Sequence, residues 1–373
     1  MSTCCFIIPP HILNHMASHG DAKLRAAARA TILASRGFHE QRQILSVMAN
    51  VALGTGGLRR TIYDARKDST VPGTLVRSEG SEPDADAAIN EAYDGAGDTY
   101  AFYDQIFGRT SIDGHGMRLQ ATVHYQEDPD EGYDNAFWNG RQMIYGDGDG
   151  TVFGPFTRSL DVIAHELTHG ITELEAGLEY HNQSGALNES FSDVFGSMVK
   201  QWKLGHTIEQ ADWLIGKELL LDGVHGKALR SMREPGTAYD DPRLGKDPQP
   251  GKMTDYQQLD DRRADDWGGV HINSGIPNRA FVLACDNLGA SHSWDKAGPI
   301  WYATLRALHK TSSFADAATT TIMYAQQLFG AQAAEAVRDA WRTVEVVPEA
   351  DTAKPVAMAA GRSAAISPVP GTP

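Results

Sequence analysis

Two histidines and a glutamate stand at a spacing that can bind and use a divalent metal ion. They are His165, Glu166 and His169, in the sequence His-Glu-Leu-Thr-His. On an α-helix, residues four apart share a face, so both imidazoles can grip one cation, and zinc accepts such nitrogen ligands. Glu166 lies one residue along and reaches the open side of the metal, where it can take a proton from metal-bound water. Taken alone, the pattern fits equally well a helix that carries two ordinary histidines.

An acidic pair downstream can complete this metal site. Two histidines leave a catalytic zinc one protein ligand short. Gly177 can end the first helix, and a second helix can then return antiparallel and offer Glu189 as the third ligand. Asp193 lies one turn beyond Glu189 and can hold the outer N–H of a zinc-bound histidine, for which we expect His165. The competing interpretation of the acidic pair is a solvated helix face.

A glycine-rich segment around one histidine forms another candidate cluster. It runs from Trp267 to Gly275, with His271 inside it and Asp266 just before it. A loop of this kind can aim an imidazole, and a nearby carboxylate keeps that imidazole charged and oriented. Without other signals, the pattern is more typical of a surface histidine.

Together these segments closely resemble the thermolysin family of zinc metallopeptidases. The matching segments follow the family's order from about residue 60 to residue 345. They comprise residues 135–140, 145–150, the zinc helix, 177–180, 188–190, 229–232 and the segment around His271. The start of the chain, Cys5-Phe6-Ile7-Ile8-Pro9-Pro10, resembles the short prosegment of protealysin-like members, although this part is less specific.

The resemblance implies a set of zinc ligands and supporting residues. His165, His169 and Glu189 would bind the zinc. Asn188 and Asp193 would lie behind these ligands. The metal would be the cofactor of a hydrolase that needs no covalent intermediate, because water is the nucleophile.

The resemblance also implies roles in catalysis. Glu166 would activate the water that attacks the scissile carbonyl. Tyr180 and His271 would donate hydrogen bonds to the tetrahedral oxyanion, where negative charge develops. Asp266 would orient His271.

Substrate binding is assigned by the same resemblance. Asn135, the carbonyl of Ala136 and Arg230 would hold the peptide backbone. The pocket for the residue after the cut would be lined by apolar side chains, each of which could equally be an ordinary core residue: Phe153, Val162, Ile215, Leu219 and Leu229. We therefore predict cleavage before Leu, Phe, Ile or Val.

The chain departs from the family where many members hold paired calcium ions. Asp161 and Asp212 remain there, but the other positions are Lys200, Leu214 and Lys217. Calcium needs several oxygen ligands, and ammonium groups repel it. We expect the paired calcium site to be lost, with Lys200 or Lys217 neutralising Asp161 or Asp212 in place of the ion.

Residues 1–50 are predicted to be a prosegment that inhibits the enzyme from within the same chain. Two means of inhibition are open. Cys4 or Cys5 can cap the zinc, because a thiolate is a strong zinc ligand. Alternatively, Pro9, Pro10 and neighbouring apolar residues plug the cleft. Processing between Asn50 and Gly56 would release the mature enzyme.

The expected architecture is α+β with two lobes and the zinc helix at the cleft. Residues 51–182 form a β-rich catalytic lobe that includes the zinc helix, and residues 183–347 form a helical lobe. Residues 348–373 are rich in Ala, Pro and Ser and are expected to be disordered. Strands are predicted at 61–64, 74–77, 119–125 and, as a sheet edge, 135–140. Helices are predicted at 21–35, 41–49, 84–107, 281–288, 299–308, 314–329 and 331–344.

Composition limits the classes of function. Of 373 residues, 41% are hydrophobic and 22% are charged, as in soluble globular proteins. The net charge of −15 argues against nucleic-acid binding, and no run reaches the roughly 20 apolar residues of a membrane helix. The N-terminus lacks the pattern of a secretory signal, and three cysteines give no disulfide framework. Secretion by another route and a cytoplasmic location both stay open.

Three functions remain in competition. The first is a neutral zinc endopeptidase, secreted or intracellular, made as a proenzyme. The second is an aminopeptidase with the same zinc core, but the Gly-x-Met-Glu-Asn motif typical of those enzymes is absent from the sequence. The third is a catalytically silent relative that only binds proteins. The presence of Glu166, Tyr180 and His271 argues against it.

Overall fold

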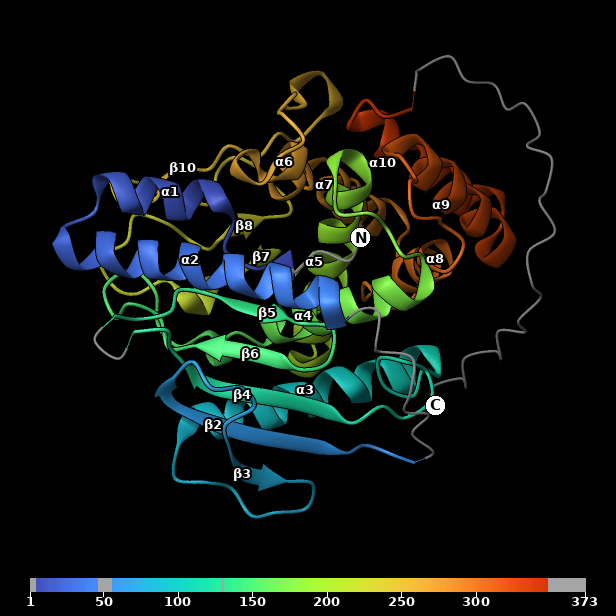
Figure 1. Ribbon diagram of the computed structural model, residues 1–373. Coiled ribbons are helices and arrows are strands. Elements are labelled where there is room, and N and C mark those ends of the chain that lie inside the picture. The colour runs from blue at the N-terminus through green and yellow to red at the C-terminus, as the bar shows by residue number, and fades with distance from the viewer. Residues whose placement is uncertain (1–4, 46–55, 129–130, 348–373) are drawn as a thin grey trace.

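The computed structural model of the chain describes residues 5–45, 56–128 and 131–347 (Figure 1). A twisted sheet and one long helix make up most of the first lobe, and the second lobe is mainly helical, as the sequence predicts. Two largely buried helices lie between the lobes. Residues 348–373, predicted to be a disordered tail, and most of the predicted processing segment 50–56 lie outside the described residues.

The sheet of the first lobe has six strands in the order β1-β5-β6-β4-β2-β3. The β6–β4 and β4–β2 pairs are parallel, and the other three pairs are antiparallel. The predicted strands at 61–64, 74–77 and 119–125 are confirmed. The strands are β1 (Cys5–Phe6), β2 (Arg60–Asp68), β3 (Thr74–Ser78), β4 (Leu119–Tyr125), β5 (Ala136–Trp138) and β6 (Met143–Gly146).

The predicted edge strand at 135–140 is β5, and it is covered by another part of the chain. The two-residue strand β1 pairs antiparallel with it, Cys5 opposite Trp138 and Phe6 opposite Phe137. An edge strand offers free backbone groups to an extended peptide. In this chain the peptide is the N-terminal segment itself.

One long helix, α3 (Ala87–Phe107), packs against the sheet and against the helix that carries His165 and His169. It begins where the side chain of Asp86 accepts a hydrogen bond from the amide of Ala88, which supplies an N-cap. It ends at Gly108, whose φ of 64° lies in the left-handed region. The predicted start at residue 84 is therefore too early, because Asp84 lies before the cap and accepts a hydrogen bond from the amide of Asp86.

Two packed helices connect the lobes: α4 (Leu160–Glu175) and α5 (Asn182–Leu204). Every residue of α4 from Asp161 to Thr172 is buried. Close contact with α5 depends on Gly196, since a Cβ there would lie 2.5 Å from the carbonyl oxygen of Asp161. Gly177 adopts a φ of 60° just after α4, as its predicted role as a helix end requires.

The second lobe continues with helices and short hairpins. The helix predicted at 281–288 begins earlier, at Gly275, because a proline in the first turn of a helix does not disrupt it. The helices are α6 (Asp266–Asn273), α7 (Gly275–Asn287), α8 (Ala297–Leu305), α9 (Phe314–Phe329) and α10 (Ala331–Thr343). The short strands are β7 (Leu214–Ile215), β8 (Arg230–Ser231), β9 (Asp240–Asp241) and β10 (Gly245–Lys246).

The N-terminal segment forms two helices that lie beside each other across the edge of the sheet (Figure 1, blue). The first, α1 (Pro10–His19), starts at a proline, which fits the first helical position. The second, α2 (Ala22–Leu45), is one continuous helix where two segments were predicted. Phe38 of α2 packs its ring 4.5 Å from that of Phe137 on β5. Among the described residues, no helix combines the length and apolar character that a bilayer crossing needs.

Candidate active site and metal centre

Three side chains from α4 and α5 converge at the cleft. The Nε2 atoms of His165 and His169 lie 3.0 Å apart. The two carboxylate oxygens of Glu189 lie 3.4 Å from these nitrogens, one oxygen to each. All three side chains are buried. Three ligand atoms of this kind, in this arrangement, match the protein part of a catalytic zinc site.

Unsatisfied polar atoms at the same place fit a bound cation. Oε2 of Glu189 and Oε1 of Glu166 are buried and have no hydrogen-bond partner. Buried polar atoms are normally paired, so these two require an explanation. A zinc ion among the histidines and Glu189 would supply the missing positive charge, and the donor set of two nitrogens and one carboxylate suits it.

The histidine rings are held from behind by polar side chains. Nδ1 of His165 lies 2.8 Å from Oδ1 of Asp193, and Nδ1 of His169 lies 2.8 Å from Oδ1 of Asn188. Asp193 in turn accepts two hydrogen bonds of 2.8 Å from Arg230. Burial opposes ionisation of Asp193, but Arg230 and His165 lower its pKa to about 2. The carboxylate therefore stays charged and fixes the orientation of His165.

Glu166 lies beside the histidines and is largely free to accept a proton. One of its oxygens accepts a hydrogen bond of 3.1 Å from the amide of Trp138 on β5. Burial raises the pKa of Glu166 to about 8, and the neighbouring Glu189 also raises it. A divalent cation at the histidines would lower this pKa again, because it places positive charge next to the carboxylate.

Tyr180 and His271 face the ligand cluster from the second lobe. The hydroxyl of Tyr180 donates a hydrogen bond to Glu189 and lies 3.2 Å from Nε2 of His271. Nδ1 of His271 lies 2.6 Å from Oδ1 of Asp266. Burial tends to lower the pKa of His271, but Asp266 and Glu189 raise it to about 9. A protonated imidazole is thus held with one N–H directed into the cleft.

The loop predicted around His271 is confirmed for the glycine-rich residues 266–269 and is wrong for residues 270–273, which are helical. Residues Asp266, Trp267, Gly268 and Gly269 all have positive φ angles. This left-handed turn lets the backbone reverse and enter the single helical turn that carries His271. Glycine patterning signals the turn but does not reveal the short helix after it.

Consecutive backbone groups of the N-terminal segment form hydrogen bonds with the residues that the resemblance assigns to substrate binding. The amide of Ile7 donates to the carbonyl of Ala136 at 3.2 Å, and the amide of Ile8 donates to Oδ1 of Asn135 at 3.0 Å. Nη1 of Arg230 donates to the carbonyl of Ile7 at 3.3 Å. A peptide of this same chain therefore fills the cleft.

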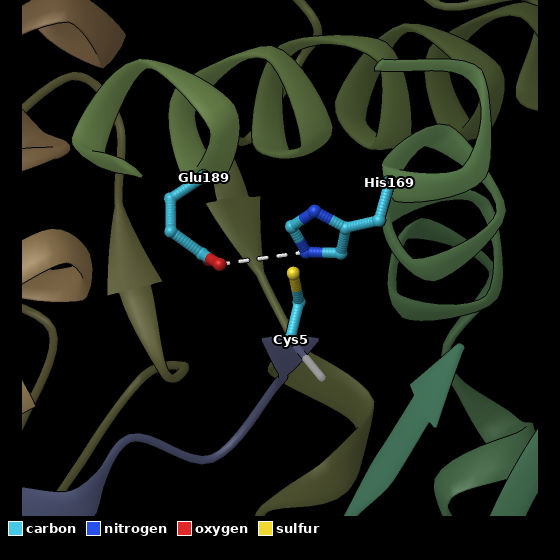
Figure 2. A group of neighbouring side chains, drawn as sticks. All are labelled: Cys5, His169 and Glu189. Atoms are coloured by element: carbon cyan, nitrogen blue, oxygen red, sulfur yellow. Dashed lines mark ion pairs between the residues drawn. The ribbon is translucent and has the colours of Figure 1, made fainter. Parts of the chain in front are cut away.

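The side chain of Cys5 points into the ligand cluster from this segment (Figure 2). Its sulfur and one ligand atom each from His169 and Glu189 all lie within 4.8 Å of one another. Cys5 is buried, and so is Cys285 elsewhere in the described residues.

The five apolar residues assigned to the specificity pocket are all buried. They belong to one hydrophobic cluster that also contains Ile7 of the N-terminal segment. Gly216 lies against two of them, since a Cβ there would meet Leu229 at 2.7 Å and Leu219 at 3.3 Å. The members are Phe153, Val162, Ile215, Leu219 and Leu229.

Of the two lysines at the expected calcium positions, Lys200 makes the closer contacts with the acidic side chains. Nζ of Lys200 lies 2.6 Å from Asp161 and 3.3 Å from Asp212, and it donates to the carbonyl of Leu214 at 2.9 Å. Lys217 is half exposed and lies 3.6 Å from Asp212. Lys200 thus fills the space beside the buried carboxylate of Asp161.

Other residues at the site were not identified from the sequence. The amide of Trp138 binds Glu166, and Nδ2 of Asn278 donates to Oδ2 of Asp193 at 2.8 Å. Ser192 places its hydroxyl 3.0 Å from Nδ1 of His169. Asn278 comes from α7, far along the chain, and has no sequence signal. Ser192 could have been noticed, because it lies one turn from Asn188 on the same helix.

Two packed helices whose side chains could hold a metal ion, a buried carboxylate beside them and a peptide in the cleft are typical of a metallopeptidase. Family comparison agrees. Residues 48–173 match the thermolysin metallopeptidase catalytic domain, and residues 176–346 match the thermolysin metallopeptidase alpha-helical domain. The chain belongs to the thermolysin family of metallopeptidases and is a hydrolase.

Individual relatives cover most of the chain. An extracellular metalloprotease of Pectobacterium carotovorum subsp. carotovorum is 51% identical over 92% of this chain and 96% of its own length. Protease PrtS of a Photorhabdus species is 49% identical over 78% of this chain and 76% of its own. The solved precursor of protealysin, a metalloproteinase from Serratia proteamaculans, aligns with a TM-score of 0.82 and 49% identity. The alignment covers 92% of this chain and 100% of the precursor. The match to a precursor supports a proenzyme form for this chain.

Proposed function

We propose that this chain is a zinc endopeptidase made as an inactive precursor, which cuts peptide bonds before bulky apolar residues. The observation that carries the proposal is the convergence of His165, His169 and Glu189 beside Glu166, whose Oε1 is buried without a hydrogen-bond partner. This converging set lies directly against a backbone segment held in the cleft. The ligands, the base and a bound peptide are therefore together in one place.

In the proposed mechanism Glu166 transfers protons, and the polar groups of the second lobe stabilise the oxyanion. Zinc, when bound, polarises the substrate carbonyl and makes water more acidic. Glu166 accepts a proton from the attacking water and later passes one to the leaving nitrogen. Tyr180 and protonated His271 donate hydrogen bonds to the oxyanion, and Asp266 keeps the ring of His271 in place.

Binding of the substrate backbone follows the contacts of the N-terminal segment. Ala136 accepts the amide of the residue after the cut, and Arg230 donates to its carbonyl. Asn135 accepts the next amide. These groups hold the scissile bond close to the metal ligands and Glu166. Holding the reacting groups in this geometry increases the rate.

The pocket should select apolar residues directly after the cut. Digestion of a peptide library by the processed enzyme is expected to give new N-termini rich in Leu, Phe, Ile and Val, because the buried lining of Phe153, Val162 and Leu229 offers no partner to a charge. Sequencing of the products measures this directly. Enrichment of charged residues after the cut would refute the assignment of the pocket.

The same proposal includes the division of the chain. Residues 1–50 act as the prosegment, residues 51–182 and 183–347 form the catalytic lobes, and cleavage between Asn50 and Gly56 yields the mature enzyme. Protein and peptide chains are the substrates. Export is supported by the name of the Pectobacterium relative, which describes it as extracellular.

We further propose that Lys200 replaces a paired calcium site. Its ammonium group lies between Asp161 and Asp212 and also binds a backbone carbonyl, so three oxygen groups that could attract a cation already have one. A second positive charge there would be repelled.

Latency of the precursor is expected to survive the replacement of both Cys4 and Cys5 by Ser. Ile7, Ile8 and Pro9 are buried in the cleft and still exclude substrate after the thiols are gone. Casein hydrolysis by the unprocessed variant measures this. Activity in the variant at the level of the processed enzyme would instead identify a thiol as the main inhibitor.

Casein hydrolysis by the processed chain, with and without a zinc chelator, tests the proposed function. We expect activity that disappears on chelation and returns when zinc is added, because His165, His169 and Glu189 would hold the metal that makes the attacking water acidic. Continued hydrolysis by a sample shown to contain no zinc would refute the proposal.

A further inference from the structure

The N-terminal segment lies in the cleft in the direction of a substrate. Four consecutive backbone groups meet four site groups in order: the carbonyl of Phe6 meets His271, the amide and carbonyl of Ile7 meet Ala136 and Arg230, and the amide of Ile8 meets Asn135. A segment bound in reverse would not present donors and acceptors in this sequence. The prosegment therefore imitates a bound peptide and does not merely cover the cleft.

This register places one peptide bond at the reacting position. Nε2 of His271 donates to the carbonyl oxygen of Phe6 at 2.8 Å, which is the contact that the oxyanion donor would make with a scissile carbonyl. The following side chain, Ile7, is fully buried in the cluster that contains the specificity pocket. A bulky apolar residue after this bond is what the pocket selects.

The side chain of Cys5 lies where the attacking water would have to bind. The sulfur of Cys5 points between His169 and Glu189 (Figure 2). Beside it, Oε2 of Glu189 and Oε1 of Glu166 are buried without hydrogen-bond partners, as expected of a metal ligand and a base. A catalytic metal needs one open position, and a thiol at this place would close it.

We infer that the Phe6–Ile7 bond is itself a substrate of the adjoining site, protected by the side chain of Cys5, and that the chain cuts this bond in cis once that side chain is removed. The inference rests on the proposed function. One water is consumed: its hydroxyl joins the carbonyl carbon of Phe6, the C–N bond breaks, and the remaining proton goes to the nitrogen of Ile7. Residues 1–6 then leave.

The cut would not by itself activate the enzyme. The remainder of the prosegment stays attached through Ile7 and Ile8 and through α1, where His11 lies 2.9 Å from the hydroxyl of Tyr239. Trimming of the N-terminus and release of the prosegment are thus separate events with separate readouts.

The test compares zinc-loaded precursors by intact mass and N-terminal sequencing. In Cys5→Ala we expect loss of residues 1–6 and a new N-terminus at Ile7, with a first-order rate constant that does not change on dilution. Wild type and the matched control Cys285→Ser, whose cysteine is buried elsewhere, should keep the bond, as should Cys5→Ala/Glu166→Ala. Cutting that slows in proportion to dilution would show attack by a second molecule and would overturn the inference.

Whether Cys5 binds the metal can be tested separately, by a measurement that does not depend on catalysis. In the inert Glu166→Ala precursor loaded with Co²⁺, a sulfur ligand gives a near-ultraviolet charge-transfer band, and this band should vanish in Cys5→Ala/Glu166→Ala. A spectrum unchanged by the loss of Cys5 would overturn its protective role.

Failure of the inference can be told from failure of the proposed function. If processed wild-type enzyme cleaves an added Phe-Ile peptide while Phe6–Ile7 stays whole in Cys5→Ala, the inference is wrong and the function stands. If the processed enzyme cleaves no added peptide either, both are wrong.

Discussion

Glu166→Gln is expected to lower the kcat of the processed enzyme for a peptide substrate by about 10²- to 10⁴-fold, the usual contribution of a general base. The amide keeps the size of the side chain and can still meet the amide of Trp138 through its oxygen. It cannot accept the proton of the attacking water. Steady-state kinetics with a fluorogenic peptide measure the effect.

The zinc content distinguishes this loss from a damaged metal site. Glu166 lies beside the ligands and is not one of them, so Glu166→Gln should retain one zinc per chain, whereas Glu189→Gln should lose affinity for it. Glu173→Gln, on the same helix α4, serves as the control and should leave kcat within about twofold, as surface substitutions usually do. Near-normal turnover by Glu166→Gln would remove Glu166 from the mechanism.

Lys200→Met is expected to reduce the free energy of unfolding by about 3–5 kcal/mol, because it leaves a buried carboxylate without its cation. Asp161 is fully buried, and its other contacts are a hydroxyl of Ser159 at 2.6 Å and the amide of Gly216 at 3.3 Å. Burial tends to lower the pKa of Lys200, but Asp161 and its acidic neighbours raise it, so the lysine stays charged. Urea denaturation measures the loss.

The matched control lies on the same helix. Lys203 pairs with Asp98 at 2.7 Å but is half exposed, so Lys203→Met should cost no more than about 1 kcal/mol. In wild type, a calcium-selective chelator should leave the melting temperature unchanged, and in Lys200→Met added calcium should raise it. A wild-type enzyme that loses stability in the chelator would show that an ion is bound after all.

The metal site was largely predictable because its residues are close in sequence. Helical spacing relates His165 to His169 and Glu189 to Asp193, and a glycine between the two helices lets them pack antiparallel. Contacts between distant segments carry no such spacing. The choice of Lys200 over Lys217, the contact of Asn278 with Asp193 and the amide of Trp138 at Glu166 all depend on packing between elements far apart in the chain.

The N-terminal segment shows the same limit on a larger scale. Its sequence predicts helices and a role in the cleft, and Asn135 and Ala136 of the predicted edge strand are expected to hold the peptide backbone. Neither pattern could predict that the two segments would pair, or that the backbone of Ile7 and Ile8 would make the contacts with these groups. That register results from matching backbone donors and acceptors on both partners. The short helix after the left-handed turn at residues 266–269 was missed for a related reason, because a run of glycines permits many turns and does not specify the structure that follows.

The pairing of β1 with β5 also affects how the protein behaves in a crowded solution. An uncovered sheet edge is a template for association with other chains. In the precursor, β1 covers the β5 edge, and Phe38 and Phe6 shield the ring of Phe137 beside it. Removal of the prosegment uncovers both the backbone edge and this aromatic surface in the same event. We therefore expect the mature enzyme to gain its substrate groove and a surface for self-association together, and the precursor to be the form better suited to accumulate at high concentration.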